Sequence, residues 1–230
     1  MTKQLALVRT LAFSSVLLGL PFGPAFGQDA SEVAERLKVL ALQQGMDLAW
    51  NNVSGDSSEM TLEGVTVKPV DEKDALPIGR ITLTGVGEDG SGYSIETLTT
   101  SPFSKSGDGV AVDVSALVMS GLRLPAPDAT DPMASMVVAY DRMELASMSV
   151  DVGGKRAFAL EGLGFEMKPP EGGRPMEFSG AAEKFSVDLT LIDDPQYKGI
   201  VQALGYDTVN GYLEMAGSWQ PEDGRWSLSQ

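Results

Sequence analysis

The sequence predicts a mainly β protein: a curled antiparallel sheet or a β-sandwich, with an amphipathic helix near the N-terminus and one short helix near the C-terminus. Two observations support this class. Apolar residues alternate with polar ones along much of the chain, as in strands that bury one face. Short sequences rich in Gly, Pro and Asp separate these runs, and such turns favour antiparallel strands joined as hairpins.

Residues 1–27 have the three parts of a secretory signal. Lys3 and Arg9 come first, an uncharged apolar stretch follows, and the small-residue site Ala25-Phe26-Gly27 ends the segment. A permanent membrane anchor is the alternative, but the apolar run is shorter than the roughly 20 residues that a spanning helix needs. We therefore predict an exported protein, most simply a periplasmic one in a bacterium, in which 28–230 form a single β-rich domain.

Cleavage of this signal is expected after Gly27. Mass analysis of the exported protein should find Gln28, or the pyroglutamate formed from it, as the first residue. A mature chain that still carries Lys3 would contradict the signal prediction.

The composition excludes several classes of function. The chain has no cysteine and no histidine, so thiol nucleophiles, disulfides, Ser-His-Asp triads and zinc sites built on His or Cys are impossible. The formal net charge is −15, and without Lys3 and Arg9 the mature chain has 15 basic residues against 32 acidic ones. Such a chain lacks the basic surface that nucleic acids require, and a bare anionic membrane repels it.

The first element after the signal is predicted to be an amphipathic helix at about 31–44. Ser31 is the expected N-cap and Gly45 the expected stop. The apolar residues recur at helical spacing: Val33, Ala34, Leu37, Leu40 and Ala41.

Strands follow, because the apolar period changes to two. The alternating positions are Met60 and Leu62; Val65 and Val67; Ile81 and Leu83; Val110, Val112, Val114, Ala116 and Val118; and Phe185, Val187, Leu189 and Leu191. The intervening turns are predicted at 54–56, 88–90, 107–109, 152–155, 169–173 and 221–224.

The C-terminal region is predicted to hold a helix and an edge strand. Asp194 and Pro195 are typical of a helix start, and apolar spacing continues to Leu204 before Gly205. After the turn at 221–224, the short run 225–230 alternates correctly to bury Trp226 and Leu228. Its outer edge would be open to a strand from a second copy or a partner protein, or to the next strand of a longer chain.

A loose internal repeat has the form apolar, polar, Gly, apolar. It occurs at Leu62-Glu63-Gly64-Val65, Leu83-Thr84-Gly85-Val86, Met119-Ser120-Gly121-Leu122 and Leu160-Glu161-Gly162-Leu163. Two apolar residues three apart cannot share one face of a regular strand, so we expect a bulge or bend at each glycine. A glycine kept free of a side chain for close approach of a ligand is the alternative.

The β-rich body, the glycine-bent strands around 62–65 and 160–163 and the signal resemble exported envelope proteins of the AsmA-like type. The resemblance implies a long curled sheet that encloses an apolar groove associated with lipid handling.

Carboxylates are the catalytic device that this composition still permits. Glycosidases need two of them about 5 to 9.5 Å apart in a cleft. The candidate pairs are Asp71 with Asp74, Asp128 with Asp131, and Asp193 with Asp194, but all lie beside turns, where acids usually serve hydrogen bonding. Calcium binding is the other use of acidic turns, although no Asp-x-Asp-x-Asp-Gly loop occurs.

The chain contains eleven methionines. They form either a pliable apolar binding surface or ordinary core filling, and we expect core filling. The residues concerned are Met133, Met136, Met143, Met148 and Met167.

The function expected from all this is a non-catalytic exported binding or structural module, whose ligand is an apolar molecule or another envelope protein. No catalytic, cofactor or metal residue is assigned. The alternative is a carboxylate-dependent enzyme that processes glycans. A groove lined by apolar side chains favours the binding module, and two carboxylates facing each other in a polar cleft favour the enzyme.

Overall fold

The computed structural model describes residues 30–90, 92–126, 140–170, 174–191, 203, 205–220 and 224–229. The secretory signal predicted at 1–27 lies outside these residues, as does nearly all of the helix predicted over 194–204. Both therefore stay predictions.

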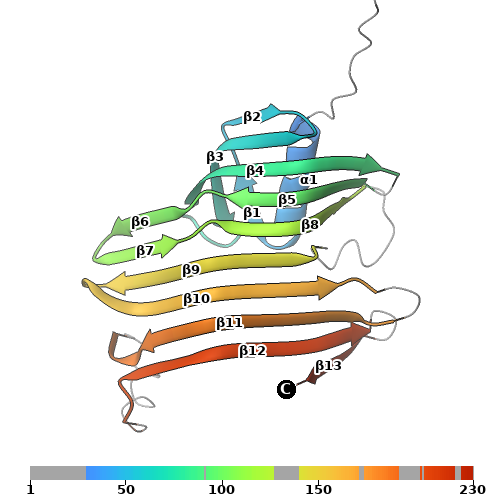
Figure 1. The fold of residues 1–230 in the computed structure, drawn as a ribbon. Helices are drawn as coiled ribbons and strands as arrows, with labels where there is room; N and C mark the ends of the chain where they lie inside the picture. Colours follow the sequence, from blue (N-terminus) through green and yellow to red (C-terminus); the bar gives the residue numbers. More distant parts are fainter. Residues whose placement is uncertain are drawn as a thin grey trace, which may run out of the picture.

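The described strands form one antiparallel sheet of thirteen strands, with helix α1 packed on one face (Figure 1). The strand order is β1-β3-β4-β5-β8-β9-β10-β11-β12-β13, with β2 also beside β3 and with β7 between β6 and β9. The mainly β class is thus confirmed. A sandwich needs two packed sheets, and the strands in the described ranges do not divide into two.

The elements have these bounds: α1 Ala30–Gln43, β1 Met46–Ala49, β2 Asn52–Gly55, β3 Glu59–Pro69, β4 Leu76–Asp89, β5 Gly92–Thr100, β6 Phe103–Gly107, β7 Val110–Val114, β8 Leu117–Pro125, β9 Arg142–Val152, β10 Lys155–Lys168, β11 Met176–Asp188, the short 3₁₀ helix η1 Leu189–Leu191, β12 Thr208–Gln220 and β13 Arg225–Ser229.

Helix α1 confirms the helix predicted over 31–44. Gly45 follows it with a φ of 77°, and its N–H donates to the Leu42 carbonyl at 2.9 Å, as expected of a helix stop. The helix already includes Ala30, a strong helix former, so Ser31 lies in its first turn and is not the N-cap. The buried face is the predicted one: Val33, Ala34, Leu37 and Leu40.

The hydrophobic core lies between α1 and the N-terminal half of the sheet. Its buried side chains come from α1, β1, β3, β4, β5 and β8. Met60, Leu62 and Leu83 are completely buried there, each with an exposed fraction of 0%. No buried side chain of this cluster comes from the described residues of β9 to β13. The helix therefore covers only part of the sheet.

The turn predictions are confirmed in position. Each predicted turn joins two strands that pair with each other: β2 with β3, β4 with β5, β6 with β7, β9 with β10, β10 with β11, and β12 with β13. Parts of the last two turns, 171–173 and 221–223, lie outside the described residues.

The prediction of one continuous strand over 110–118 is wrong in one respect, because the strand is broken at Ser115 and Ala116. β7 and β8 both pair with β9, on either side of the break. The Ser115 hydroxyl accepts a hydrogen bond from the Ser147 N–H at 2.9 Å, and the Ser115 N–H donates to the Ser147 carbonyl. These bonds hold the two halves in line across the irregularity.

The strand predicted over 185–191 ends early, at Asp188. The Asp188 carboxylate accepts hydrogen bonds from the N–H and the hydroxyl of Thr190, at 2.9 and 2.6 Å. Such a local bond offers the backbone an alternative to the sheet ladder, so Leu189–Leu191 forms a 3₁₀ turn.

The glycine repeat is confirmed as a set of bends. Gly64, Gly85, Gly121 and Gly162 have φ values of 64°, 62°, 67° and 64°, which residues with side chains rarely adopt. The bend brings apolar residues three apart onto one face, as Leu62 and Val65 show by being fully buried together.

A register shift accompanies the bend at Gly64 but not the one at Gly162. At Gly162 the pairs on either side keep the same register with both neighbouring strands. The reason is that both neighbouring strands interrupt their apolar alternation at the position opposite Gly162. Leu163 faces Leu145 on β9 and Ala182 on β11, and Leu160 faces Met148 on β9 and Phe185 on β11. On each neighbour, as on β10, the two apolar residues are three apart in sequence. The bends therefore form a line across adjacent strands.

Candidate functional site

The sheet has two chemically different faces. Residues directly opposite each other on paired strands share a face, so the registers carry the face assignment from strand to strand. Met119, which packs against the core, pairs with Met143, and Met143 pairs with Phe165. The helix side of the sheet therefore continues from β8 through β9 and β10 to the last strands.

On β9 to β13 this helix-side face consists of apolar side chains, and we call it the open face. Its residues are Met143, Leu145, Met148 and Val150 on β9; Phe158, Leu160, Leu163, Phe165 and Met167 on β10; Met176, Phe178, Ala182, Phe185 and Val187 on β11; Val209, Leu213, Met215 and Trp219 on β12; and Trp226 and Leu228 on β13.

The open face lies beyond the area that α1 covers. In Figure 1 the helix lies against β3, β4, β5 and β8, and β9 to β13 extend past it. Burial falls accordingly toward the C-terminal strands, where the exposed fraction is 50% for Leu213, 65% for Trp226 and 71% for Leu228. Trp226 and Leu228 alternate as predicted but are not buried, because within the described ranges no element packs over them.

The methionines on β9 and β10 are also less buried than core residues. Met143, Met148 and Met167 belong to the open face and are only partly buried, so the expectation that they fill the core is wrong. Met133 and Met136 lie outside the described residues. Flexible thioether side chains on a half-exposed face can adapt to ligands of different shape.

A run of aromatic rings crosses the open face. Ring centroids are 6.3 Å apart for Tyr140 and Phe165, 6.2 Å for Phe165 and Phe178, and 5.9 Å for Phe178 and Trp226. Trp226 in turn stacks on Trp219 at 5.8 Å. At the other end of the run, Tyr140 packs against the core, and burial raises the pKa of its hydroxyl. The aromatic run therefore leads from the core to the last strand.

Three phenylalanine rings lie over glycines of the next strand. A Cβ built on Gly180 would lie 2.7 Å from the Phe165 ring, and one on Gly217 would lie 2.6 Å from the Phe178 ring. Phe185 covers Gly211 in the same way. A ring that covers a strand glycine shields its backbone and lies along the sheet. The rings therefore fill the space beside these glycines, and the residues of the open face carry no charged, hydroxyl or amide side chain.

The opposite, outer face of the same strands is polar and carries ion pairs. Lys184 pairs with Glu161 at 3.3 Å, Lys168 with Glu177 at 3.6 Å, and Arg142 with Glu166 at 3.7 Å. All six side chains are about half-exposed or more. Water screens such pairs strongly, so they mainly keep this face solvated.

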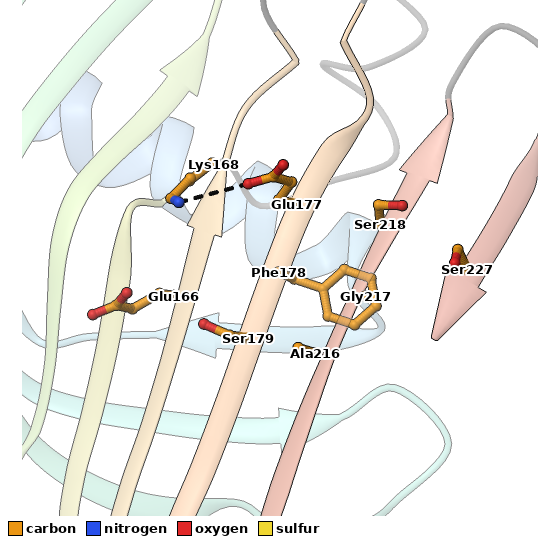
Figure 2. A pocket seen from close by; sticks show the side chains of 9 residues that line it. All are labelled: Glu166, Lys168, Glu177, Phe178, Ser179, Ala216, Gly217, Ser218 and Ser227. Atoms are coloured by element: carbon orange, nitrogen blue, oxygen red, sulfur yellow. Dashed lines mark ion pairs between the residues drawn. The ribbon is translucent and has the colours of Figure 1, made fainter. Parts of the chain in front are cut away.

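A hollow of about 440 Å³ lies at the end of β10 to β13 (Figure 2). Two carboxylates line it, Glu166 and Glu177, and Figure 2 shows the ion pair of Glu177 with Lys168. Ser179, Ala216, Ser218 and Ser227 leave space between the longer side chains, and Phe178 and Gly217, which belong by register to the open face, complete the lining.

Glu166 and Glu177 lack the environment of a general acid. Glycosidases keep one carboxyl protonated by burying it in an apolar pocket. Both side chains here are more than half exposed, and each forms an ion pair with a basic side chain, Glu166 with Arg142 and Glu177 with Lys168. Nothing in the sequence marked these two residues, since they meet only when β10 pairs with β11.

The carboxylate pairs predicted from the sequence do not form a cleft within the described residues. Asp71 and Asp74 are exposed in the connection between β3 and β4. The other two predicted pairs, at 128 and 131 and at 193 and 194, lie outside the described residues. Within the part of the chain that the structure describes, no group of three or more acidic side chains is placed to hold a metal ion.

Among the described residues there is no helix with the length and apolar character needed to cross a membrane. In comparisons with protein-family models, with curated proteins and with solved structures, no match to this chain was found.

Proposed function

We propose that the protein is a non-catalytic, exported binding module that holds an apolar ligand on the open face. The observation that carries this proposal is the continuation of one apolar face past the edge of its helix cover, onto β9 to β13. Monomeric soluble proteins rarely expose large contiguous apolar patches, and those that do generally use them for binding.

The chemistry of the open face favours an elongated aliphatic ligand. Its rings lie along the sheet and its other residues are aliphatic or thioether side chains, so the indole N–H groups of Trp219 and Trp226 are the side-chain hydrogen-bond donors among its residues. A saturated chain gains about 0.8 kcal/mol for each methylene removed from water. About ten methylenes laid across the strands would thus offset much of the cost of association, which is of the order of 4 to 15 kcal/mol.

The curled sheet expected from the sequence belongs to the same proposal. A sheet that curls toward its open face would enclose the ligand on two sides and shield it from water. The polar outer face, with its ion pairs, would then keep the exported protein in solution.

The alternative function, a carboxylate-dependent enzyme acting on glycans, would use the hollow lined by Glu166 and Glu177, although both carboxyl groups are exposed and paired with basic side chains. Serine hydroxyls and carboxylates are suitable partners for sugar hydroxyls. Replacing both glutamates by glutamine tests it: a glycan-cleaving activity that disappears in this variant would support the enzyme over the binding module.

We expect a brominated sixteen-carbon fatty acid to quench the tryptophan fluorescence of the purified protein, because Trp219 and Trp226 belong to the open face. Leu213→Lys should weaken this binding at least about tenfold, since a lysine there meets the apolar chain. Tyr212→Lys is the matched control: Tyr212 is 75% exposed on the same strand but on the outer face, and its replacement should leave binding unchanged.

Two outcomes would contradict the proposed function. One is the absence of quenching by the fatty acid in the unmodified protein. The other is an equal effect of the two lysine variants, which would mean that binding does not distinguish the faces. Mass spectrometry of organic extracts from protein purified out of its own compartment would identify the natural ligand.

A further inference from the structure

The two edges of the sheet differ in how they are protected. At one edge lie β1 and β2, which have four residues each, and α1 packs against both. Short strands and a covering helix are common devices that prevent an edge from pairing with another chain. At the other edge lies β13, which pairs with β12 and has no second partner strand within the described residues.

The residues of β13 do not protect this edge. Trp226 and Leu228 are the most exposed residues of the open face, at 65% and 71%. The strand contains neither proline nor lysine, and its only charged residue is Arg225. In a chain with a net charge of −15, a strand without acidic residues is a place where two copies can approach with little repulsion.

We propose that β13 pairs antiparallel with β13 of a second copy, around a twofold axis at Ser227. In this register Trp226 of each copy lies opposite Leu228 of the other, and Arg225 lies opposite Ser229, so no like charges meet. The apolar pairs continue the open face of one copy into that of the other. This interface shares Trp226 and Leu228 with the open face, but the strand pairing itself does not depend on a ligand.

A pair of five-residue strands is a small interface. Stable complexes bury about 800 Å² on each partner, which such a pair alone does not reach. The dimer is therefore expected to depend on concentration. Light scattering during size-exclusion chromatography should show the mass rising from that of one copy toward that of two as the loaded concentration increases.

A single cysteine tests the register directly, because the chain has none of its own. Residues directly opposite each other in an antiparallel pair have Cβ atoms about 4.5 to 5.5 Å apart, close to the separation in a disulfide. Ser227→Cys should therefore give a covalent dimer under mild oxidation. Ser54→Cys is the control, since Ser54 is an exposed serine on edge strand β2.

We expect the Ser227→Cys variant to cross-link at least about tenfold faster than the Ser54→Cys variant. Leu228→Lys, introduced into Ser227→Cys, should abolish this advantage by placing a charge in the apolar pairs. Equal rates for the two cysteine variants would overturn the proposal, and so would a monomer at every concentration.

The fatty-acid assay keeps this proposal distinct from the proposed function. A dimer without fatty-acid binding would leave the interface standing and refute the ligand. Quenching of tryptophan by the fatty acid in a protein that stays monomeric would support the ligand and refute the interface.

Discussion

Replacing Leu83 by alanine is expected to lower the free energy of unfolding by about 2 to 5 kcal/mol. Leu83 on β4 has an exposed fraction of 0% and belongs to the core beneath α1. Its removal leaves a cavity that the surrounding side chains fill only in part. Urea denaturation of the purified protein measures the effect.

Leu213→Ala is the control for this experiment. Leu213 is also a leucine within a strand, but it is half-exposed on the open face, at 50%. We expect its replacement to cost less than about 1 kcal/mol, because little apolar surface returns to water. Equal losses for the two variants would show that the open face is covered as well as the core is.

Replacing Gly162 by valine is expected to destabilise the protein by about 1 to 3 kcal/mol. The φ of Gly162 is 64°, where a β-branched residue is strained, and a Cβ there would lie 2.5 Å from the Glu183 side chain. Gly64 shares this conformation, and Gly64→Val should behave alike.

Gly164→Val provides the matched comparison on the same strand. Gly164 lies two residues further along β10 and has an ordinary strand φ, and a Cβ added to it would have no described atom within 4 Å. Valine favours strands, so this change should be neutral or slightly stabilising. Thermal unfolding of both variants decides the matter: if Gly162→Val melts no lower than Gly164→Val, the bend does not require glycine.

Features that depend on local sequence could be predicted. The helix ending before Gly45, the hairpin turns and the bends at glycine follow from residue types and spacings within a few positions. The exceptions are also local, but they depend on particular hydrogen bonds. Spacing alone did not reveal that Asp188 would bind Thr190 and end its strand.

The candidate site could not be predicted in the same way. Alternation shows that Leu213 and Trp226 share a face with other apolar residues, but not whether a helix covers that face. Coverage depends on where α1 packs in the finished sheet, which is a long-range property. The hollow near Glu166 likewise forms from four strands that only the complete topology brings together.

Because the bends lie opposite one another, a change in the length of one strand must be matched in its neighbours. Gly162 lies level with Ala146 on β9 and with Glu183 on β11, and each of these strands has one residue more between its apolar pairs than regular alternation needs. Removing Gly162 alone would restore alternation in β10 but leave it one residue short of both neighbours. Val114 on β7 and Leu117 on β8 face Met148 and Leu145, with the same extra residue between them. Deletions at this level are thus expected to be tolerated only in concert, so that shorter relatives of this chain would lose one residue from each of these three strands and one from the link between β7 and β8.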